Sequence, residues 1–255
     1  MTKNEISYYK NLLKDRKFRA EQKKFIIEGA HLIEEAIKSK YYKNNIEKIF
    51  IRKDFEDKQI INELSGKYEL EYLSSKEFEK ISDTVKSQGI SAILNITDED
   101  KSKETGNIIL ALDRINDPGN LGTILRTAYW FGVELILLSK DSVDVYNPKT
   151  VRASQGAMFN LKIRTELDLI REVKNYRDYK IFLTDLSASK SLEDVNINKS
   201  DKIILAFGNE ASGLSTDLLS LGFEKIKIKG FSDCESLNLS VSAGITLYYF
   251  RNKLS

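Results

Sequence analysis

The sequence predicts an α/β protein in two parts, each alternating short strands with helices. Apolar runs of strand length alternate with helical patterns along the chain, as expected for sheets covered by helices. The stretch DEDKSKETGN contains no apolar residue and interrupts this alternation. Beyond it, short apolar strands alternate again with helices, which favours a mainly parallel sheet covered on both faces. We therefore expect a first domain at 1–97, a linker at 98–107 and a second domain at 108–255.

The first domain is predicted to be a small α/β sandwich that begins with a basic helix over 7–20. Gly29 marks the turn into a second helix, and Ser74 or Ser75 is expected to cap a later one, with Glu77 in its first turn. The remaining expected elements are strands at 24–27, 46–51, 68–73 and 91–96, and helices at 30–39 and 55–64.

The second domain is predicted to alternate six strands with five helices. Strands are expected at 108–112, 134–138, 161–164, 180–184, 203–207 and 225–229, and helices near 121–131, 147–153, 166–177, 213–219 and 237–252. The last helix is apolar nearly all round, so we expect it to be buried, packed against a second subunit as well as its own sheet. Ser236 is its expected N-cap.

Composition excludes several classes of protein. The chain has 255 residues, of which 41% are hydrophobic and 31% charged, typical of a soluble globular protein with a sizeable core. One cysteine, Cys234, excludes an internal disulfide and a cysteine-based metal site. The single histidine, His31, is expected to be an ordinary surface residue, and its isolation removes most triad and zinc chemistries. No apolar run approaches the ~18 residues of a membrane span, and no signal peptide is evident. We expect a cytoplasmic protein without a metal.

Basic residues crowd the first 25 positions, although the formal net charge of the chain is only +2. Such a segment is either a surface that attracts nucleic-acid phosphates or a solvated amphipathic helix. The candidate phosphate contacts are Arg16, Lys17 and Arg19.

The stretch 109–138 predicts a ligand-binding loop. An apolar strand, a polar turn with Pro118 and Gly119, a helix and a second strand follow one another, and ligands bind at the carboxyl ends of parallel strands. A G-x-G-x-x-G dinucleotide fingerprint is absent. Asn120 and Arg126 are expected to face the mouth of the loop; a surface ion pair is the alternative for Arg126.

Two later stretches carry similar polar clusters. In 204–215 an apolar strand ends at Gly208, and Glu210 is an acid–base group, a hydrogen-bond acceptor or a cap. In 235–250 the amide of Asn238 is placed among apolar residues, where a buried amide needs partners. It either ties down a loop or binds a ligand.

Taken together, these stretches resemble a known family. The ordered set NDPGNLGTILRTA, FGNExxGL and ESLNLSVSAGI, with NPKTVRASQGAMF at 147–159, resembles the SpoU or TrmH-type RNA 2′-O-ribose methyltransferases. The resemblance covers essentially all of 108–252. KFIIEGAHLIEEAI and DTVKSQGISAI in the first domain resemble the RNA substrate-binding domain that precedes the catalytic domain in many members, which is similar in fold to ribosomal protein L30e.

This resemblance implies a fold and a cofactor. The second domain would contain a deep trefoil knot, a feature otherwise very rare in proteins. S-adenosylmethionine would bind to the knot loops in a bent shape, and the protein would be a homodimer through its C-terminal helix. The family often has Ile-Pro-Met where this chain has Ile228, Lys229 and Gly230, which affects the adenine pocket.

The resemblance also implies residue roles. The residues that match the catalytic motifs are Asn120, Arg126, Glu210, Ser236 and Asn238. The residues that match cofactor contacts are Leu186, Gly208, Glu210, Ile228 and Leu237. Arg152 matches an arginine that touches RNA or the surroundings of the cofactor.

The implied reaction is attack of a ribose 2′-hydroxyl on a sulfonium methyl group. The family mechanism makes Arg126 the base, but an arginine stays protonated at neutral pH. We therefore expect Arg126 to hold the phosphate beside the target ribose and to stabilise the developing oxyanion. The favoured substrate is 23S ribosomal RNA, with transfer RNA as the alternative. Three further classes stay open at this point: a non-catalytic RNA-binding module, a nucleotide-dependent oxidoreductase and a base methyltransferase of the same superfamily.

Overall fold

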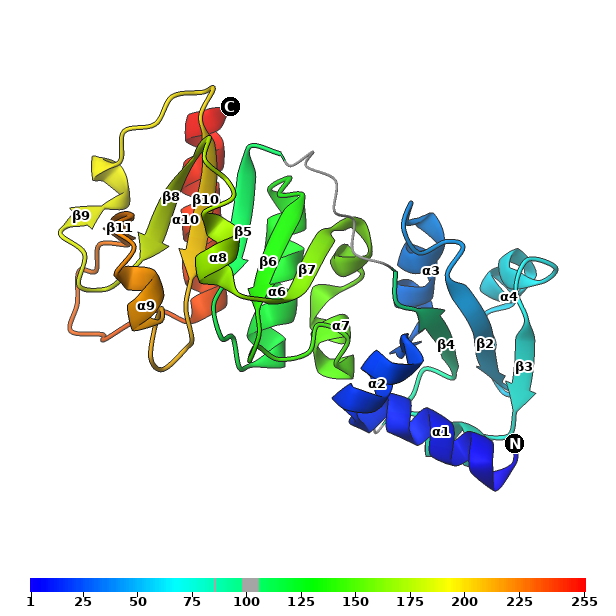
Figure 1. Cartoon of the computed structure of the whole chain (residues 1–255). Coiled ribbons are helices and arrows are strands. Elements are labelled where there is room, and N and C mark those ends of the chain that lie inside the picture. Colours follow the sequence, from blue (N-terminus) through cyan, green and yellow to red (C-terminus); the bar gives the residue numbers. More distant parts are fainter. Residues whose placement is uncertain (85, 98–105) are drawn as a thin grey trace. The chain divides into compact units, whose positions relative to one another are not determined.

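The computed structural model describes residues 1–84, 86–97 and 106–255, which form two compact units (Figure 1). The first unit comprises residues 1–98 and 144–160, and the second comprises 99–143 and 161–255. Most of the linker predicted at 98–107 lies outside the described residues. The sequence assigned 144–160 to the second domain, whereas in the structure this segment packs within the first unit.

The first unit is a four-stranded mixed sheet with the order β1-β4-β2-β3. Strand β4 pairs antiparallel with β1 and β2, and β3 adds parallel to β2. Its elements are α1 (Lys3–Lys14), α2 (Arg16–Gln22), β1 (Lys24–Glu28), α3 (Ala30–Lys38), β2 (Ile46–Arg52), α4 (Lys58–Leu64), β3 (Leu70–Leu73), α5 (Ser75–Phe78), η1 (Glu79–Ile81), β4 (Ile90–Asn95), α7 (Pro148–Ser154) and η2 (Ala157–Asn160).

The predicted basic helix is in fact two helices that meet at Asp15. The Asp15 side chain accepts a hydrogen bond from the main-chain N–H of Phe18 at 3.1 Å, so it caps α2 and ends α1. The predicted cap of α5 is confirmed, because Ser74 and Glu77 form a capping box.

The segment 144–160 is held in the first unit by polar and aromatic contacts. The Ser39 hydroxyl donates to the carbonyl of Phe159, and the Tyr42 and Phe159 rings lie 5.2 Å apart. The Phe25 and Tyr146 rings are separated by 4.8 Å. Helix α7 therefore packs beside β1, although it follows the second strand of the other unit in sequence.

The second unit is a seven-stranded parallel sheet with the order β7-β6-β5-β10-β8-β11-β9, as the sequence predicts in its class and direction. Its elements are β5 (Ile108–Leu112), α6 (Pro118–Trp130), β6 (Leu135–Ser139), β7 (Lys162–Leu167), α8 (Leu169–Val173), β8 (Tyr179–Thr184), β9 (Lys190–Ser191), η3 (Leu192–Asp194), β10 (Lys202–Phe207), α9 (Thr216–Leu219), β11 (Glu224–Lys227) and α10 (Leu239–Leu254).

Helices cover both faces of this sheet (Figure 1). Ile181 of β8 belongs to a core cluster with Val173 of α8 and Leu218 of α9. The next residue, Phe182, points to the other face, where its ring lies 5.0 Å from Phe250 of α10. This alternation follows the two-residue period of a strand.

Helices α6 and α10 begin at positions that differ from the predicted ones. Asp117 caps α6 by accepting from the N–H of Asn120 at 2.8 Å, and Pro118 occupies the first turn, where its missing N–H costs nothing. The N-cap of α10 is Asn238, so the prediction of Ser236 is wrong.

Helix α10 is buried on one side only, which corrects the prediction of burial all round. Ala243, Leu247 and Phe250 are buried, whereas Val241, Ile245 and Tyr248 are exposed. Among the described residues no helix is long and apolar enough to cross a membrane.

Candidate active site

Four loops of the second unit lie at one edge of its sheet. They follow β5, β10, β8 and β11, which are adjacent parallel strands, so their carboxyl ends meet at the same edge. The loops contain the residues that the sequence singled out around Asn116, Leu186, Gly208 and Leu237. This edge is therefore the candidate site.

The Glu210 carboxylate joins the loop after β10 to the loop after β5. Its Oε2 atom accepts a hydrogen bond from the main-chain N–H of Asn116 at 3.1 Å. Its Oε1 atom accepts from the N–H of Asp117 and from Nδ2 of Asn120, each at 3.1 Å. Of the three interpretations offered by the sequence, the structure favours the acceptor, because both carboxylate oxygens are occupied.

The charge of Glu210 is stabilised by these donors. Partial burial raises the pKa of the Glu210 carboxyl, but the hydrogen bonds from Asn120 and from the main chain outweigh this and hold the pKa below its usual range. Glu210 is thus ionised at neutral pH and is not a proton donor.

A further hydrogen bond links Asn120 to Asn238, which lies in the polar stretch 235–250. The Nδ2 atom of Asn238 donates to Oδ1 of Asn120 at 2.9 Å. Oδ1 of Asn238 accepts from the N–H of Ser240 at 2.8 Å and so caps α10. Asn238 is exposed and is not the buried amide that the sequence suggested. Of the two roles left open for it, this structure supports the tying down of a loop.

Arg126 and Ser236 are exposed at the surface of this unit. The Arg126 side chain forms no ion pair or hydrogen bond with the residues that the structure describes, so the alternative of a surface ion pair is not supported. The Ser236 hydroxyl is likewise without a hydrogen bond in the described part of the chain. Both polar groups are accessible to a ligand.

Gly208 allows the loop after β10 to fold back tightly on itself. A Cβ atom on Gly208 would lie 2.1 Å from the main-chain carbon of Gly213 and 2.1 Å from the nitrogen of Leu214. Any other residue would push the two segments of main chain apart. Gly208 is therefore required for the shape of this loop.

Three further residues that the sequence analysis did not single out hold the loops together. Nδ2 of Asn209 donates to the carbonyl of Arg114 at 2.9 Å, and Asp113 accepts from the N–H of Ser215 at 2.7 Å. Arg114 adopts a φ of +55° and donates to the carbonyl of Gly213 at 3.2 Å. Asn209 lies inside a matched motif and was open to prediction; the unusual conformation of Arg114 leaves no signal in the sequence.

The predicted cofactor contacts line the same edge with apolar groups. Leu186 and Leu237 are 67% and 47% exposed, and Ile228 is half-buried. Between residues 229 and 237 the main chain forms no hydrogen bond to main-chain groups of the described residues. The N–H of Cys234 donates to the Ser232 hydroxyl and the carbonyl of Ser236 accepts from the Cys234 thiol, whereas the other main-chain groups of this segment have no partner among the described residues. Exposed apolar side chains beside such main-chain groups fit a nucleoside ligand.

Lys229 and Gly230, which replace the Pro-Met of the family, lie in this loop. The Lys229 ammonium is 5.4 Å from the centre of the Phe231 ring, and both side chains are exposed. Apart from Gly230 itself and its two neighbours in the chain, no described residue has an atom within 4 Å of the place where a Cβ of Gly230 would be.

The candidate RNA contacts belong to the first unit, and one of them is wrong. Arg19 is only 3% exposed; its guanidinium contacts Asp144 at 2.7 Å and donates to the carbonyls of Leu12 and Leu13. Every nitrogen of this buried guanidinium already has a partner, so Arg19 is not accessible to a phosphate and is structural.

The remaining three candidates are at least partly accessible. Arg16 and Lys17 are exposed, and Lys17 forms an ion pair with Glu21 at 3.9 Å. Arg152 lies in α7 and its Nη1 atom is 2.8 Å from Asp83.

His31 is exposed, as expected. Within the described ranges no cluster of three or more His, Cys, Asp or Glu side chains has the arrangement of a metal site.

Comparison with known proteins identifies the class to which this fold and site belong. Residues 107–248 match the SpoU rRNA Methylase family, and residues 3–92 match the MRM3-like substrate binding domain. The chain belongs to the SpoU rRNA methylase family and is an RNA methyltransferase.

Individual relatives cover most of the chain. It is 31% identical over 240 residues to the 23S rRNA (guanosine(2553)-2′-O)-methyltransferase RlmP of Bacillus subtilis, covering 94% of this chain and 93% of the relative. It is 32% identical over 191 residues to the mitochondrial rRNA methyltransferase 3 of Homo sapiens, covering 71% of this chain and 44% of that protein.

Solved structures resemble this chain over nearly its full length. An AdoMet-bound rRNA methyltransferase from Sinorhizobium meliloti superposes with a TM-score of 0.85 at 25% identity, covering 100% of this chain and 97% of the other. The SpoU methyltransferase AviRb from Streptomyces viridochromogenes, in complex with AdoMet, gives 0.88 at 21% identity, covering 98% of both chains. The second likeness shows the fold alone.

Replacing Glu210 by Gln is expected to destabilise the protein at neutral pH. A Gln side chain has one acceptor oxygen, so its amide group must face at least one of the three donors, at a cost of about 1–2 kcal/mol and a fall of roughly 2–8 °C in the melting temperature. Because the pKa of Glu210 is lowered by folding, its contribution is complete above the ordinary value of 4.5 and is lost as the pH falls through the folded-state pKa.

Melting temperatures measured by circular dichroism across this pH range test the role of Glu210. The difference between wild type and Glu210→Gln should be largest near neutrality and shrink in acid. Glu235→Gln, at an exposed residue of the same unit, is the matched control and should melt like wild type. Equal melting temperatures for Glu210→Gln and wild type at neutral pH would contradict the role assigned to Glu210.

Proposed function

We propose that this protein transfers a methyl group from S-adenosylmethionine to a ribose 2′-hydroxyl of 23S ribosomal RNA. The observation that carries the proposal is the hydrogen-bonded chain Glu210–Asn120–Asn238, which unites three motifs of the family at the ligand-binding edge of the sheet. The 31% identity to a 23S rRNA 2′-O-methyltransferase over nearly the whole chain supports the same substrate and position on the ribose.

The cofactor is held by the loops after β8, β10 and β11. Leu186, Ile228 and Leu237 supply apolar contacts to the adenosine, and main-chain groups of these loops supply its hydrogen bonds. Gly208 keeps the β10 loop tight against itself, which leaves room at the edge of the sheet. S-adenosylmethionine supplies a methyl group on a positively charged sulfur, so the leaving group needs no acid.

The RNA side of the site is formed by Arg126 and the neighbouring polar side chains. Arg126 binds the phosphate beside the target ribose and stabilises the oxyanion that develops on the 2′-oxygen. Glu210 is a poor base, because the hydrogen bonds that its oxygens accept hold the pKa of its carboxyl below the usual range. It fixes Asn120, which fixes Asn238, while the free hydroxyl of Ser236 is available to orient the ribose.

The course of the chain supports the trefoil knot expected from the family. Strand β11 lies beyond β8, yet Asn238, eleven residues after its end, bonds to Asn120 beside β5. The segment between them must return past the carboxyl ends of β8 and β10. We infer that it passes through the loops that follow these strands, and that the first unit is an RNA-binding domain similar to L30e.

Exposed apolar groups on α10 and α6 support a homodimer. Val241, Ile245 and Tyr248 recur along one face of α10, and Tyr129 and Trp130 lie exposed at the end of α6. These two helices pack together, and Arg251 of α10 donates to the carbonyl of Phe131. Exposed apolar side chains on two helices that pack together fit a second copy of the chain.

A transfer RNA substrate and a non-catalytic RNA-binding module are the competing functions. A transfer RNA substrate would require the same site, and the 31% identity to a 23S rRNA 2′-O-methyltransferase over 94% of this chain favours ribosomal RNA. A non-catalytic RNA-binding module would lack the cofactor. Isothermal titration with S-adenosylmethionine tests for such a module: we expect binding, and the absence of measurable heat would favour the module.

Replacing Arg126 by Lys is expected to lower kcat by roughly 100-fold or more, because Lys keeps the charge but loses the planar pair of donors aimed at the phosphate and the oxyanion. Transfer of tritium from labelled S-adenosylmethionine to unmodified 23S rRNA transcript measures the effect. Arg177→Lys, at an exposed residue of the same unit, should retain wild-type turnover. Near-normal turnover by Arg126→Lys would rule out the proposed role of Arg126.

Replacing Ile245 by Glu is expected to convert the dimer into a monomer. The carboxylate would be buried without a partner in the centre of the apolar surface. Sedimentation velocity should give the mass of two chains for wild type and of one chain for Ile245→Glu. Asn175→Glu, at an exposed residue just after α8, which covers the other face of the sheet, is the control. A monomeric wild type would refute the dimer.

A further inference from the structure

We propose that four lysines around a cavity in the first unit bind the phosphate backbone of the RNA substrate. The lysines are Lys10, Lys14, Lys76 and Lys80, which we call the lysine cluster. The proposal rests on the RNA methyltransferase function proposed above and adds to it a surface on a different unit from the catalytic residues.

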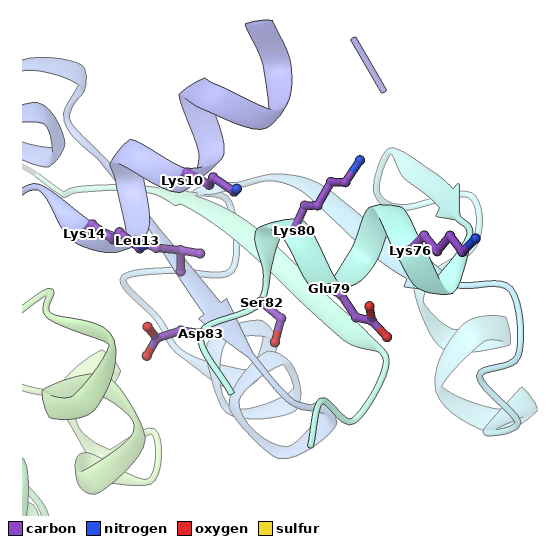
Figure 2. Close-up of a pocket in the computed structure, with 8 residues that line it drawn as sticks. All are labelled: Lys10, Leu13, Lys14, Lys76, Glu79, Lys80, Ser82 and Asp83. Atoms are coloured by element: carbon purple, nitrogen blue, oxygen red, sulfur yellow. The ribbon is translucent and has the colours of Figure 1, made fainter. Parts of the chain in front are cut away.

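The cavity lies between α1 and the short helices α5 and η1 (Figure 2). Its volume is about 500 Å³. Lys10 and Lys14 lie one turn apart on the same side of α1, and Lys76 and Lys80 show the same spacing across α5 and η1. Residues about 60 positions apart in the sequence thus line one cavity.

The lysine cluster gathers four uncompensated charges around one cavity. All four side chains are exposed, and none forms an ion pair or hydrogen bond with the residues that the structure describes. Several lysines elsewhere in this unit do have acidic partners: Lys17 with Glu21, Lys24 with Glu47, Lys38 with Glu34 and Glu35, and Lys48 with Glu69 and Glu71.

The acidic residues at the cavity do not cancel this charge. Asp83 is already bound to Arg152, whose Nη1 atom lies 2.8 Å from the carboxylate. Glu28 does not line the cavity, and it accepts hydrogen bonds from the hydroxyls of Ser82 and Thr84. Glu79 is then the single uncompensated carboxylate among the described residues lining the cavity, against four ammonium groups. The cavity therefore has a positive potential.

The chemistry of this surface fits a nucleic-acid backbone better than a protein partner. Lysine ammonium groups on flexible side chains bind phosphates as point charges, without a fixed geometry. A stable protein interface needs an apolar or aromatic centre, and the apolar residue that lines this cavity, Leu13, is 7% exposed. The positive charge without an apolar anchor indicates a partner that presents regularly spaced negative charges.

The lysine cluster also explains which part of the basic N-terminal segment is available to RNA. Arg19 is buried and bonded to Asp144, and Lys17 is paired with Glu21. Lys10 and Lys14 lie on the same first helical segment but remain unpaired, and the distant Lys76 and Lys80 complete their surface.

The test is a variant in which all four cluster lysines are changed to Gln, compared with a control carrying Lys43→Gln, Lys53→Gln, Lys58→Gln and Lys67→Gln. The control residues are exposed lysines of the same unit without a partner among the described residues, so both variants lose the same charge. Binding to unmodified 23S rRNA transcript is measured over a series of salt concentrations. Circular dichroism and titration with S-adenosylmethionine verify that each variant is folded and that its cofactor site is intact.

We expect the cluster variant to bind this RNA roughly tenfold more weakly or worse at moderate salt, with a plot of log K against log salt that is less steep by about 3, close to one unit for each lost phosphate contact. The control should keep the wild-type slope. If both variants bind like wild type, the lysine cluster is not an RNA contact, and the proposed function stands. If wild type itself neither binds nor methylates this RNA, the substrate and the lysine cluster are both overturned. The pair Lys10→Gln and Lys80→Gln, expected to reduce the slope by about half as much, repeats the test should the fourfold variant fail to fold.

Discussion

The candidate active site depends on one carboxylate. Glu210 accepts hydrogen bonds from two consecutive main-chain N–H groups and one side-chain amide of the β5 loop. Without an acceptor there, these donors would face water and the loop would have no fixed position relative to β10. Because Asn120 is held in this way, it can in turn hold Asn238, the residue that begins α10. Glu210 thus fixes the start of α6 directly and the start of α10 through Asn120. Arg126 lies on α6, so its position depends on the same carboxylate.

Much of the fold could be predicted because buried parallel strands are apolar throughout. The predicted strands at 108–112 and 203–207 agree with β5 and β10 to within one residue. The first residues of α6 and α10 were missed, since caps such as Asp117 and Asn238 are distinguished from neighbouring polar residues only by their geometry. The packing of 144–160 with the first unit depends on tertiary contacts such as that between Ser39 and Phe159, which leave no periodic signal. Strand β9 has two residues, too few for any pattern.

The sequence predicted some residues of the candidate site correctly and others wrongly. Asn120, Glu210 and Asn238 were found because they recur in family motifs, and the structure joins them by hydrogen bonds. The prediction that Arg19 contacts RNA was wrong, because the sequence of the basic segment does not show which arginines are exposed to solvent. The charge of Arg19 is matched by a carboxylate 125 positions away. The same limit hid the lysine cluster, whose two halves meet only when α1 packs beside η1. Motifs of neighbouring residues can be recognised in the sequence, whereas the partner of a charged side chain depends on the fold.

The central claim is the transfer of a methyl group to a ribose oxygen and not to a base. Its most direct test is to incubate the wild-type protein with labelled S-adenosylmethionine and unmodified 23S rRNA transcript, digest the RNA to nucleosides and identify the labelled product by chromatography and mass spectrometry. We expect a single 2′-O-methylnucleoside with the added mass on the ribose. Label in a methylated base, or no label in RNA by a protein that binds the cofactor, would contradict it.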